Sequence, residues 1–170
     1  MVGPLTPGIL VCKENEEGKS YLRLVVQRVK QASVRIQNET VGEIGPGLLV
    51  FLGVGQGDTE EDVGYLVEKV LHLRIFADDQ SRFNLSLMDI HGSLLIVSQF
   101  TLWGDCRKGR RPSFSHSAPP AKAEPLYNLF IHKAKEAGLT VASGRFQEMM
   151  EVELINDGPV TLLLDSHRLF

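Results

Sequence analysis

The stretch Glu151-Val-Glu-Leu-Ile-Asn-Asp-Gly-Pro-Val-Thr-Leu-Leu-Leu-Asp165 places the pair Gly158-Pro159 between two segments that have the composition of β-strands. Proline has no N–H group to donate to a β-ladder, so in sheets it is confined to edges, strand starts and bulges. An X-Pro bond can also be cis at modest cost, and a cis proline in a folded protein usually serves a purpose. The pair therefore indicates a place where the backbone itself is presented.

The rest of the chain combines short strand-like runs with two helical patterns. Strands rich in branched residues are predicted at residues 22–29, 32–37, 41–44, 48–54, 73–76, 94–99, 140–142, 151–155 and 160–165. One helix is predicted after Asp58 or Thr59, with its buried face at positions 63, 66, 67, 70 and 71. A second helix opens at Pro119-Pro120 and ends at Gly138, with Leu126, Tyr127, Phe130, Ile131 and Ala134 on its buried face. Two helices against many strands predict a mixed α/β fold with a barrel-like, largely antiparallel β-sheet.

Length and composition limit the classes of protein to which the chain can belong. Its 170 residues are 43% hydrophobic and 23% charged, which fits one globular domain, predicted over residues 21–170. Residues 1–20 are rich in Pro, Gly and polar side chains, and we expect them to form a flexible N-terminal extension. The net charge of −3 offers no global attraction for nucleic acid, so any basic surface must be local.

Cysteine and histidine usage excludes several kinds of site. Cys12 and Cys106 have no C-x-x-C partner, so we expect neither a disulfide framework nor a zinc ribbon, and a reducing, cytoplasmic location. The histidines show no metal-binding spacing, so no metal or other cofactor is expected. No apolar run approaches the length that spans a membrane.

Polar side chains gather where the predicted strand at residues 94–99 ends. Ser98, Gln99, Phe100 and Thr101 follow one another there, and the two hydroxyl groups and the amide can donate and accept hydrogen bonds. The plain alternative is turn chemistry, for which Ser and Thr are common at strand ends.

A basic segment follows a few residues later. Arg107, Lys108, Arg110 and Arg111 surround one glycine, and arginine is suited to bidentate contact with phosphate. The alternative is a solvated loop without a ligand.

Several motifs taken together closely resemble the D-aminoacyl-tRNA deacylase family, also called D-tyrosyl-tRNA deacylase. The motifs are Gln27-Arg-Val29, Gly45-Pro-Gly-Leu-Leu49, Gly57-Asp-Thr-Glu-Glu61, Leu73-Arg-Ile-Phe76, Ser98-Gln-Phe-Thr-Leu102, Lys108-Gly-Arg-Arg-Pro-Ser-Phe114 and Asn156-Asp-Gly-Pro-Val-Thr161. The resemblance runs from about residue 22 to residue 166. It implies a homodimer with active sites at the subunit interface, which hydrolyses the ester between a D-amino acid, or glycine, and the 3′-terminal adenosine of tRNA.

The resemblance also assigns residues to the site. It implies that Gly158-Pro159 enters the partner's site and directs carbonyl oxygens at the substrate, so that an L-side chain clashes with backbone and is rejected. Ser98, Gln99, Phe100 and Thr101 match the catalytic half of the site. Because no base lies beside Thr101 in the motif, we expect backbone N–H groups near Phe100 and Thr101 to polarise the ester, with the ribose 2′-OH helping to activate water.

Three further positions match supporting roles in the family. Arg28 matches the arginine that supports the Gly-Pro segment, and Phe146 and Met150 match residues of the adenine pocket. The chain departs from the family between those two, where Gln147-Glu148 replaces the usual Gly-Ala, and we expect Glu148 to face solvent.

Two other functions remain open at this stage. A non-catalytic module that binds the tRNA 3′ end would keep the fold and the basic segment without turnover. A different acyl-ester hydrolase on the same scaffold would act on small esters without RNA.

Overall fold

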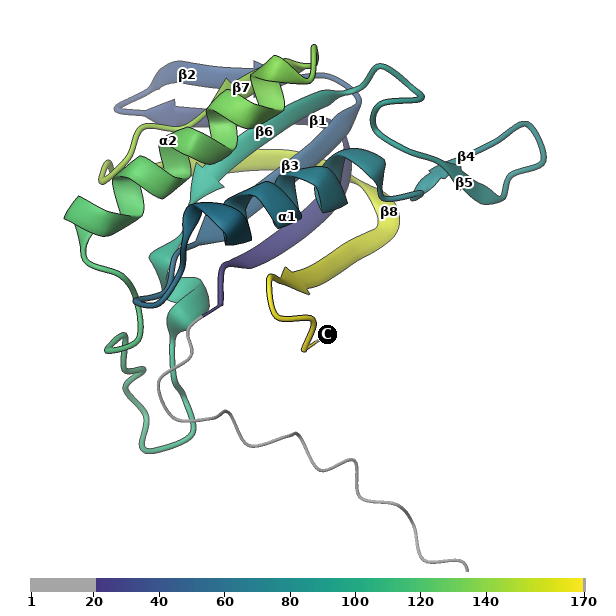
Figure 1. Cartoon of the computed structure of the whole chain (residues 1–170). Coiled ribbons are helices and arrows are strands. Elements are labelled where there is room, and N and C mark those ends of the chain that lie inside the picture. The colour runs from purple at the N-terminus through teal and green to yellow at the C-terminus, as the bar shows by residue number, and fades with distance from the viewer. Residues whose placement is uncertain (1–20, 170) are drawn as a thin grey trace, which may run out of the picture.

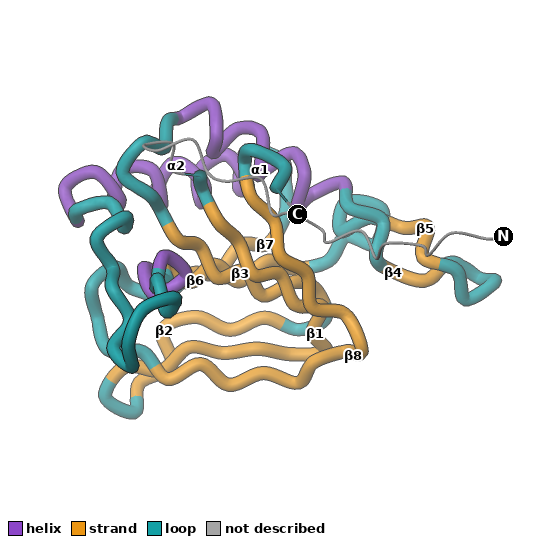
Figure 2. The backbone as a smooth tube through the Cα atoms, turned by 90° about the horizontal axis from the view of Figure 1, so that it is seen from below, coloured by secondary structure: helices purple, strands orange, loops and turns teal. Residues whose placement is uncertain are grey.

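The computed structural model describes residues 21–169, so the predicted N-terminal extension lies outside the described residues. The elements in chain order are β1 (Arg23–Ile36), β2 (Glu39–Ile44), β3 (Gly47–Gly53), α1 (Glu60–His72), β4 (Phe76–Ala77), β5 (Phe83–Leu85), β6 (Ser93–Ser98), the 3₁₀-helix η1 (Phe100–Trp103), α2 (Pro120–Glu136), β7 (Thr140–Ser143) and β8 (Glu151–Asp165). Two helices lie side by side along one face of a curved sheet, and a small β4–β5 hairpin projects away from it (Figures 1 and 2).

The main sheet is mixed and almost closes on itself. Its strand order is β2-β1-β3-β6-β7, and β8 also pairs with β1. At its two ends, Gly42 of β2 meets the backbone of Ser143 in β7, where an added Cβ would lie 2.8 Å from the Ser143 carbonyl oxygen. Only glycine permits so close an approach of two backbones. The contact brings the sheet edges together and confirms the predicted mixed α/β, barrel-like fold.

Strand direction follows from the connections. β1 runs antiparallel to β2, β3 and β8, whereas β3–β6 and β6–β7 are parallel. Parallel neighbours need a long crossover, and α1 and α2 provide the two crossovers. The sheet is therefore antiparallel around β1 and parallel beneath the helices.

The core has two parts because β3 is buried on both faces. Leu48, Val50 and Leu52 pack toward the helices, and Leu49 packs into a second cluster with Val97 on the other side of the sheet. Near-continuous burial of this kind is typical of a strand between parallel neighbours.

Both helices bury the faces that their spacing predicts. In α1, Val63, Leu66, Val67, Val70 and Leu71 are all buried, and Thr59 is the N-cap, with its N–H donating to Asp62 Oδ2 at 2.8 Å. In α2 the predicted residues are buried except Ile131, which is partly exposed, and Ala123 joins them. Gly138 follows the helix with φ +86°, as expected of a glycine that ends a helix.

The strand boundaries correct the sequence prediction in three places. The strands predicted at residues 22–29 and 32–37 merge into one continuous strand, β1 (Arg23–Ile36), and the predicted strands on each side of Gly158-Pro159 form one strand, β8. The long strands persist because β8 pairs with β1 before and after the Gly-Pro pair. Residues 73–75 are not strand, because only Phe76–Ala77 finds a partner, in the short β5 that the sequence analysis missed.

The ladder between β1 and β8 is interrupted opposite Arg28. Gln27 pairs with Thr161 and Val29 pairs with Asn156, so the register skips residues 157–160. The Gly158-Pro159 peptide bond inside this gap is cis, and both residues are exposed. The fold therefore presents at its surface a short piece of backbone that does not pair with β1, as the sequence indicates.

Candidate functional site

A pocket of about 670 Å³ opens where β6 ends. Ser98, Gln99 and Phe100 line it from the carboxyl end of that strand, and Phe146 and Met150 line it from the segment before β8. Five of the residues assigned from the sequence therefore meet in one cavity, although some fifty residues separate the two groups.

The end of β6 is held by contacts with β1 and β3. The N–H of Gln99 donates to the Leu52 carbonyl oxygen at 2.7 Å, and Trp103 Nε1 of η1 donates to the Gly53 carbonyl oxygen at 3.2 Å. Arg23 Nη1 donates to the Leu102 carbonyl oxygen at 3.0 Å, and its guanidinium lies 3.9 Å from the centre of the Trp103 ring. The 3₁₀-helix that follows the motif is therefore fixed from two strands.

Thr101 lies outside the pocket lining and is exposed. Its hydroxyl oxygen accepts a hydrogen bond from Gln99 Nε2. Within residues 21–169, no histidine, lysine or carboxylate side chain makes a hydrogen bond to Thr101 that would activate it as a nucleophile. The backbone N–H groups of the first residues of η1 have no acceptor within that helix, and Phe100 and Thr101 occupy those positions.

Aromatic side chains that the sequence analysis did not assign complete the pocket. Phe114 lies edge-on to Phe100 with ring centres 5.1 Å apart, and Tyr127 of α2 lies 5.8 Å from Phe146. The Tyr127 hydroxyl donates to the carbonyl oxygens of Ile96 and Gly144, and burial raises its pKa to about 12. Phe114 ends the motif that begins at Lys108, and this motif could have identified it as a site residue. The helical spacing of Tyr127 indicates only a place in the hydrophobic core.

The Gln147-Glu148 departure changes the pocket rim. Gln147 and Glu148 both line the pocket, and both are exposed, as predicted for Glu148. Gln147 has φ +62°, in the left-handed region that favours glycine. The family's usual glycine at this position thus has a structural reason, and this chain keeps the turn without it.

Gly158 and Pro159 do not line this pocket. Arg28 of β1, only 8% exposed, instead contacts Asp157, the residue before Gly158. Its Nε donates to the Asp157 carbonyl oxygen at 3.0 Å and lies 3.0 Å from Asp157 Oδ2, and its Nη1 donates to the Ile75 carbonyl oxygen. A buried cation needs such partners, and Arg28 has them in the Asp157 carboxylate and two backbone carbonyl oxygens.

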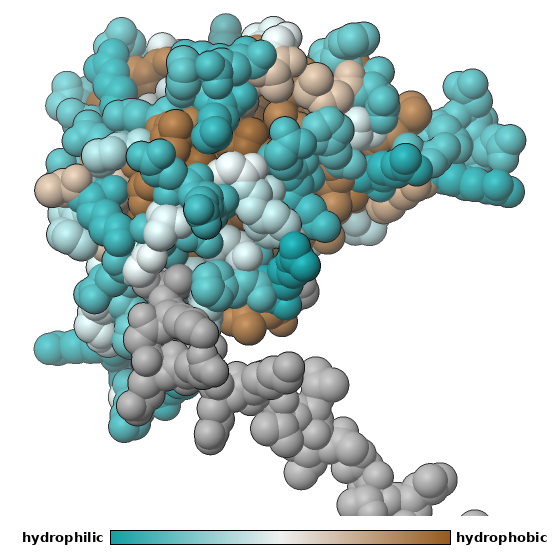
Figure 3. Space-filling model, viewed as in Figure 1, coloured by the Kyte–Doolittle hydropathy of each residue, from teal (hydrophilic) through white to brown (hydrophobic). Residues whose placement is uncertain are grey.

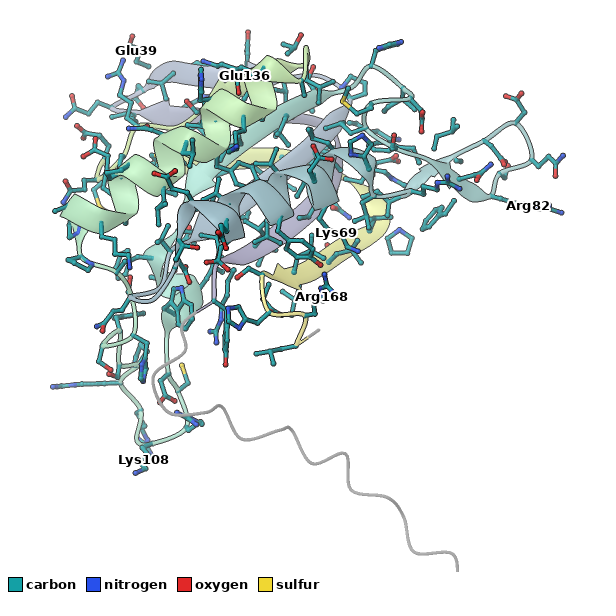
Figure 4. The ribbon with its side chains drawn as sticks, in the orientation of Figure 1. Glu39, Lys69, Arg82, Lys108, Glu136 and Arg168 are labelled. Carbon is teal, nitrogen blue, oxygen red and sulfur yellow. The ribbon has the colours of Figure 1, made fainter. Side chains whose placement is uncertain are left out.

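The basic segment forms a loop that projects from the body, with Lys108 at its far end (Figure 4). Asp105 and Ser113 close the loop through two backbone hydrogen bonds of 2.8 and 2.9 Å. Arg107 binds Asp105 through Nε at 2.9 Å and Nη2 at 2.8 Å, and this pairing holds the pKa of the Asp105 carboxyl well below its usual range. All four basic side chains are exposed, and among them the charge of Arg107 is already matched by Asp105.

Two features are absent from the part of the chain that the structure describes, a metal-ligand cluster and a membrane-spanning helix. No group of three or more His, Cys, Asp or Glu side chains there could hold a metal ion. Neither α1 nor α2, nor any other helix within residues 21–169, is long and apolar enough to cross a membrane.

Comparison with known proteins places the chain in a family. The family model described as D-Tyr-tRNA(Tyr) deacylase matches residues 25–165. Relatives named D-aminoacyl-tRNA deacylase from Thermosipho africanus and Halothermothrix orenii are each 58% identical over 149 residues, covering 88% of this chain and 100% of theirs.

Two solved structures share the fold of this chain. A c-Myc DNA unwinding element binding protein is 38% identical, with a TM-score of 0.79 over 84% of this chain and 97% of its own. A probable eukaryotic D-amino acid tRNA deacylase, 22% identical, shares the fold with a TM-score of 0.76 over 86% of this chain and 100% of its own. From the matched length, the identity and the motifs at the pocket, the chain belongs to the D-Tyr-tRNA(Tyr) deacylase family.

Proposed function

We propose that this protein hydrolyses the ester that joins a D-amino acid, or mischarged glycine, to the 3′-terminal adenosine of tRNA. Water attacks the carbonyl carbon, the bond to the ribose oxygen breaks, and that oxygen takes up a proton. The observation that carries the proposal is 58% identity over the full length of relatives named D-aminoacyl-tRNA deacylase. An aminoacyl-tRNA substrate also fits the cytoplasmic location expected from the cysteine content.

The proposed site is shared between two copies of the chain. Gly158 and Pro159 are exposed and do not reach the pocket of their own chain, which supports insertion into the pocket of a second copy. Ile155 and Leu163, on either side of the pair in β8, are 49% and 53% exposed, an apolar surface suited to a partner. In this homodimer the carbonyl oxygens of Gly158-Pro159 face the substrate's α-carbon, and an L-side chain clashes with them.

The pocket supplies the rest of the proposed site. Phe146 and Met150 bind the terminal adenine, and Ser98 and Gln99 position the aminoacyl group. The N–H groups of Phe100 and Thr101 polarise the ester carbonyl, in the manner of an oxyanion hole. The tRNA phosphates are contacted by three side chains of the basic loop, Lys108, Arg110 and Arg111. Arg107 mainly stabilises the loop through its ion pair with Asp105.

The deciding assay measures deacylation of D-Tyr-tRNA and L-Tyr-tRNA by the purified protein. Turnover of the D-form alone supports the proposal, whereas tRNA binding without turnover supports the non-catalytic binding module. Hydrolysis of small esters without hydrolysis of either aminoacyl-tRNA supports the alternative of a different acyl-ester hydrolase. Complementation tests the shared site. Phe100→Pro removes the backbone N–H proposed to polarise the ester, and Gly158→Val alters the segment proposed to enter the partner's pocket. Each protein alone should be inactive and the two should regain activity when mixed and refolded, and no recovery contradicts a site built from two chains.

Thr101→Ala tests the mechanism. The backbone N–H survives this substitution, so single-turnover deacylation is expected to fall by less than about 100-fold. A loss above about 10⁴-fold with unchanged tRNA binding would instead make Thr101 a nucleophile.

A further inference from the structure

The ring of Phe83 is exposed on a projecting hairpin and belongs to neither of the two core clusters within residues 21–169. Phe83 begins β5 and is 57% exposed, and the hairpin that carries it extends from the body with a hydrophilic tip (Figure 3). The hairpin loop is held by Asp78, whose Oδ1 accepts from the N–H groups of Gln80 and Arg82 and whose Oδ2 accepts from Asn84. Arg82 lies at its outer end (Figure 4). The ring is therefore carried on an ordered turn.

Phe83 contacts the arginine that supports the Gly-Pro segment. The Arg28 guanidinium lies 5.1 Å from the centre of the Phe83 ring and 6.0 Å from that of Phe76, on the paired strand. Both distances fall in the range of cation–π attraction. β4 and β5 thus bring two aromatic rings to one cation on β1.

Arg28 in turn replaces the missing β-ladder. The register between β1 and β8 skips residues 157–160, and Arg28 Nε binds the Asp157 carbonyl oxygen within that gap. Because a peptide unit is planar, a fixed Asp157 carbonyl also fixes the N–H of Gly158. The orientation of the exposed backbone that follows then depends on where the Arg28 guanidinium is held.

We propose that Phe83 is a positioning residue for chiral selection, because its ring holds Arg28 against Asp157 and thereby sets the orientation of Gly158-Pro159. This inference rests on the proposed function. In the proposed reaction, Phe83 contacts no reacting atom. The ring limits the positions open to a guanidinium that otherwise borders solvent, and a looser guanidinium lets the Gly158-Pro159 carbonyl oxygens yield to an L-side chain.

The test compares kcat/KM for D-Tyr-tRNA and L-Tyr-tRNA in Phe83→Ala and Phe83→Tyr. Loss of one exposed cation–π contact is expected to lower the D-to-L ratio about two- to fivefold in Phe83→Ala. Phe83→Tyr keeps a ring and should retain the wild-type ratio. A merely structural role would lower both activities together and leave the ratio unchanged.

Tyr65→Ala is the control, since the Tyr65 ring lies at the same 5.1 Å from the Arg168 guanidinium, whereas the rings against Arg28 within residues 21–169 are those of Phe76 and Phe83. Its D-to-L ratio should stay at the wild-type value. An unchanged ratio in Phe83→Ala, or an equal fall in Tyr65→Ala, overturns the inference. If wild-type protein fails to deacylate D-Tyr-tRNA, the proposed function itself fails, and the two failures are thus distinct.

Discussion

Asp58 gives the protein a pH-dependent stability that one substitution should remove. The side chain is 2% exposed; Oδ2 accepts the Gly55 N–H at 2.6 Å, and among residues 21–169 the buried Oδ1 has no hydrogen-bond donor. Burial raises the pKa of this carboxyl from 3.8 to about 7, the Gly55 hydrogen bond and the charges of Lys122 and Arg23 offsetting only part of the rise. Charging it in the folded state is therefore unfavourable.

The direction of the effect follows from proton binding. Between pH 3.8 and about 7 the folded protein binds this proton and the unfolded chain releases it, so the free energy of unfolding falls as pH rises. At about 1.4 kcal/mol per pH unit, the full range corresponds to a loss on the order of 4 kcal/mol that is complete above pH 7. Asp58→Asn keeps an acceptor for Gly55 and cannot titrate. Relative to wild type, we expect it to gain stability from pH 4 to pH 8 by this amount.

Urea denaturation at pH 4, 5, 6, 7 and 8 measures the difference in unfolding free energy between variant and wild type at each pH. Taking the difference cancels the contributions of the other titrating groups. Asp79→Asn, on the exposed hairpin loop, controls for the same chemical change at the surface. A difference that stays constant with pH for Asp58→Asn would refute the reasoning.

Two more predictions concern the pocket rim and the basic loop. Gln147→Gly removes the strain of a left-handed backbone and should raise the unfolding free energy by about 1 kcal/mol in urea denaturation. Glu148→Gly, at a position without positive φ, should lower the unfolding free energy. Equal effects of the two substitutions would contradict the argument. Replacing Lys108, Arg110 and Arg111 with Gln should weaken tRNA binding and reduce the slope of log affinity against log salt by about 0.7 to 0.9 per lost phosphate contact. Arg107→Gln, whose arginine is paired with Asp105, should change the slope less, and an unaltered slope in the triple variant would remove the loop from the interface.

Much of the fold was predictable because it depends on local patterns. The helix over residues 60–72 has its cap, acidic first turn and apolar spacing within one short segment, and all five predicted core residues are buried. The strand predicted at residues 73–76 reaches β4 only at Phe76, and β5 is not predicted. Strands of two and three residues are too short to show periodicity, and each forms only by pairing with the other. The parallel pairs also depend on tertiary placement, because a sequence of strands and helices does not state which strands become neighbours.

The candidate site divides in the same way. The sequence assigns Ser98–Thr101, Gly158-Pro159, Arg28, Phe146 and Met150 to the candidate site, by resemblance and by residue types that are unusual in their segments. Phe114, Tyr127 and Phe83 were not assigned, because an aromatic residue has the same sequence signal whether it fills a core or borders a site. Only packing distinguishes these roles.

By itself, the sequence determined that Gly158-Pro159 marks an exceptional place in a strand, since a residue without an N–H is confined to sheet edges, strand starts and bulges. Only the tertiary structure decided that the strand resumes beyond it on the same partner, that Arg28 holds the gap, and that the pair lies away from its own pocket. The physical reason is the difference in sequence separation over which these interactions act. Backbone chemistry acts within a few residues, whereas register, salt bridges and cavities join residues that are more than a hundred positions apart.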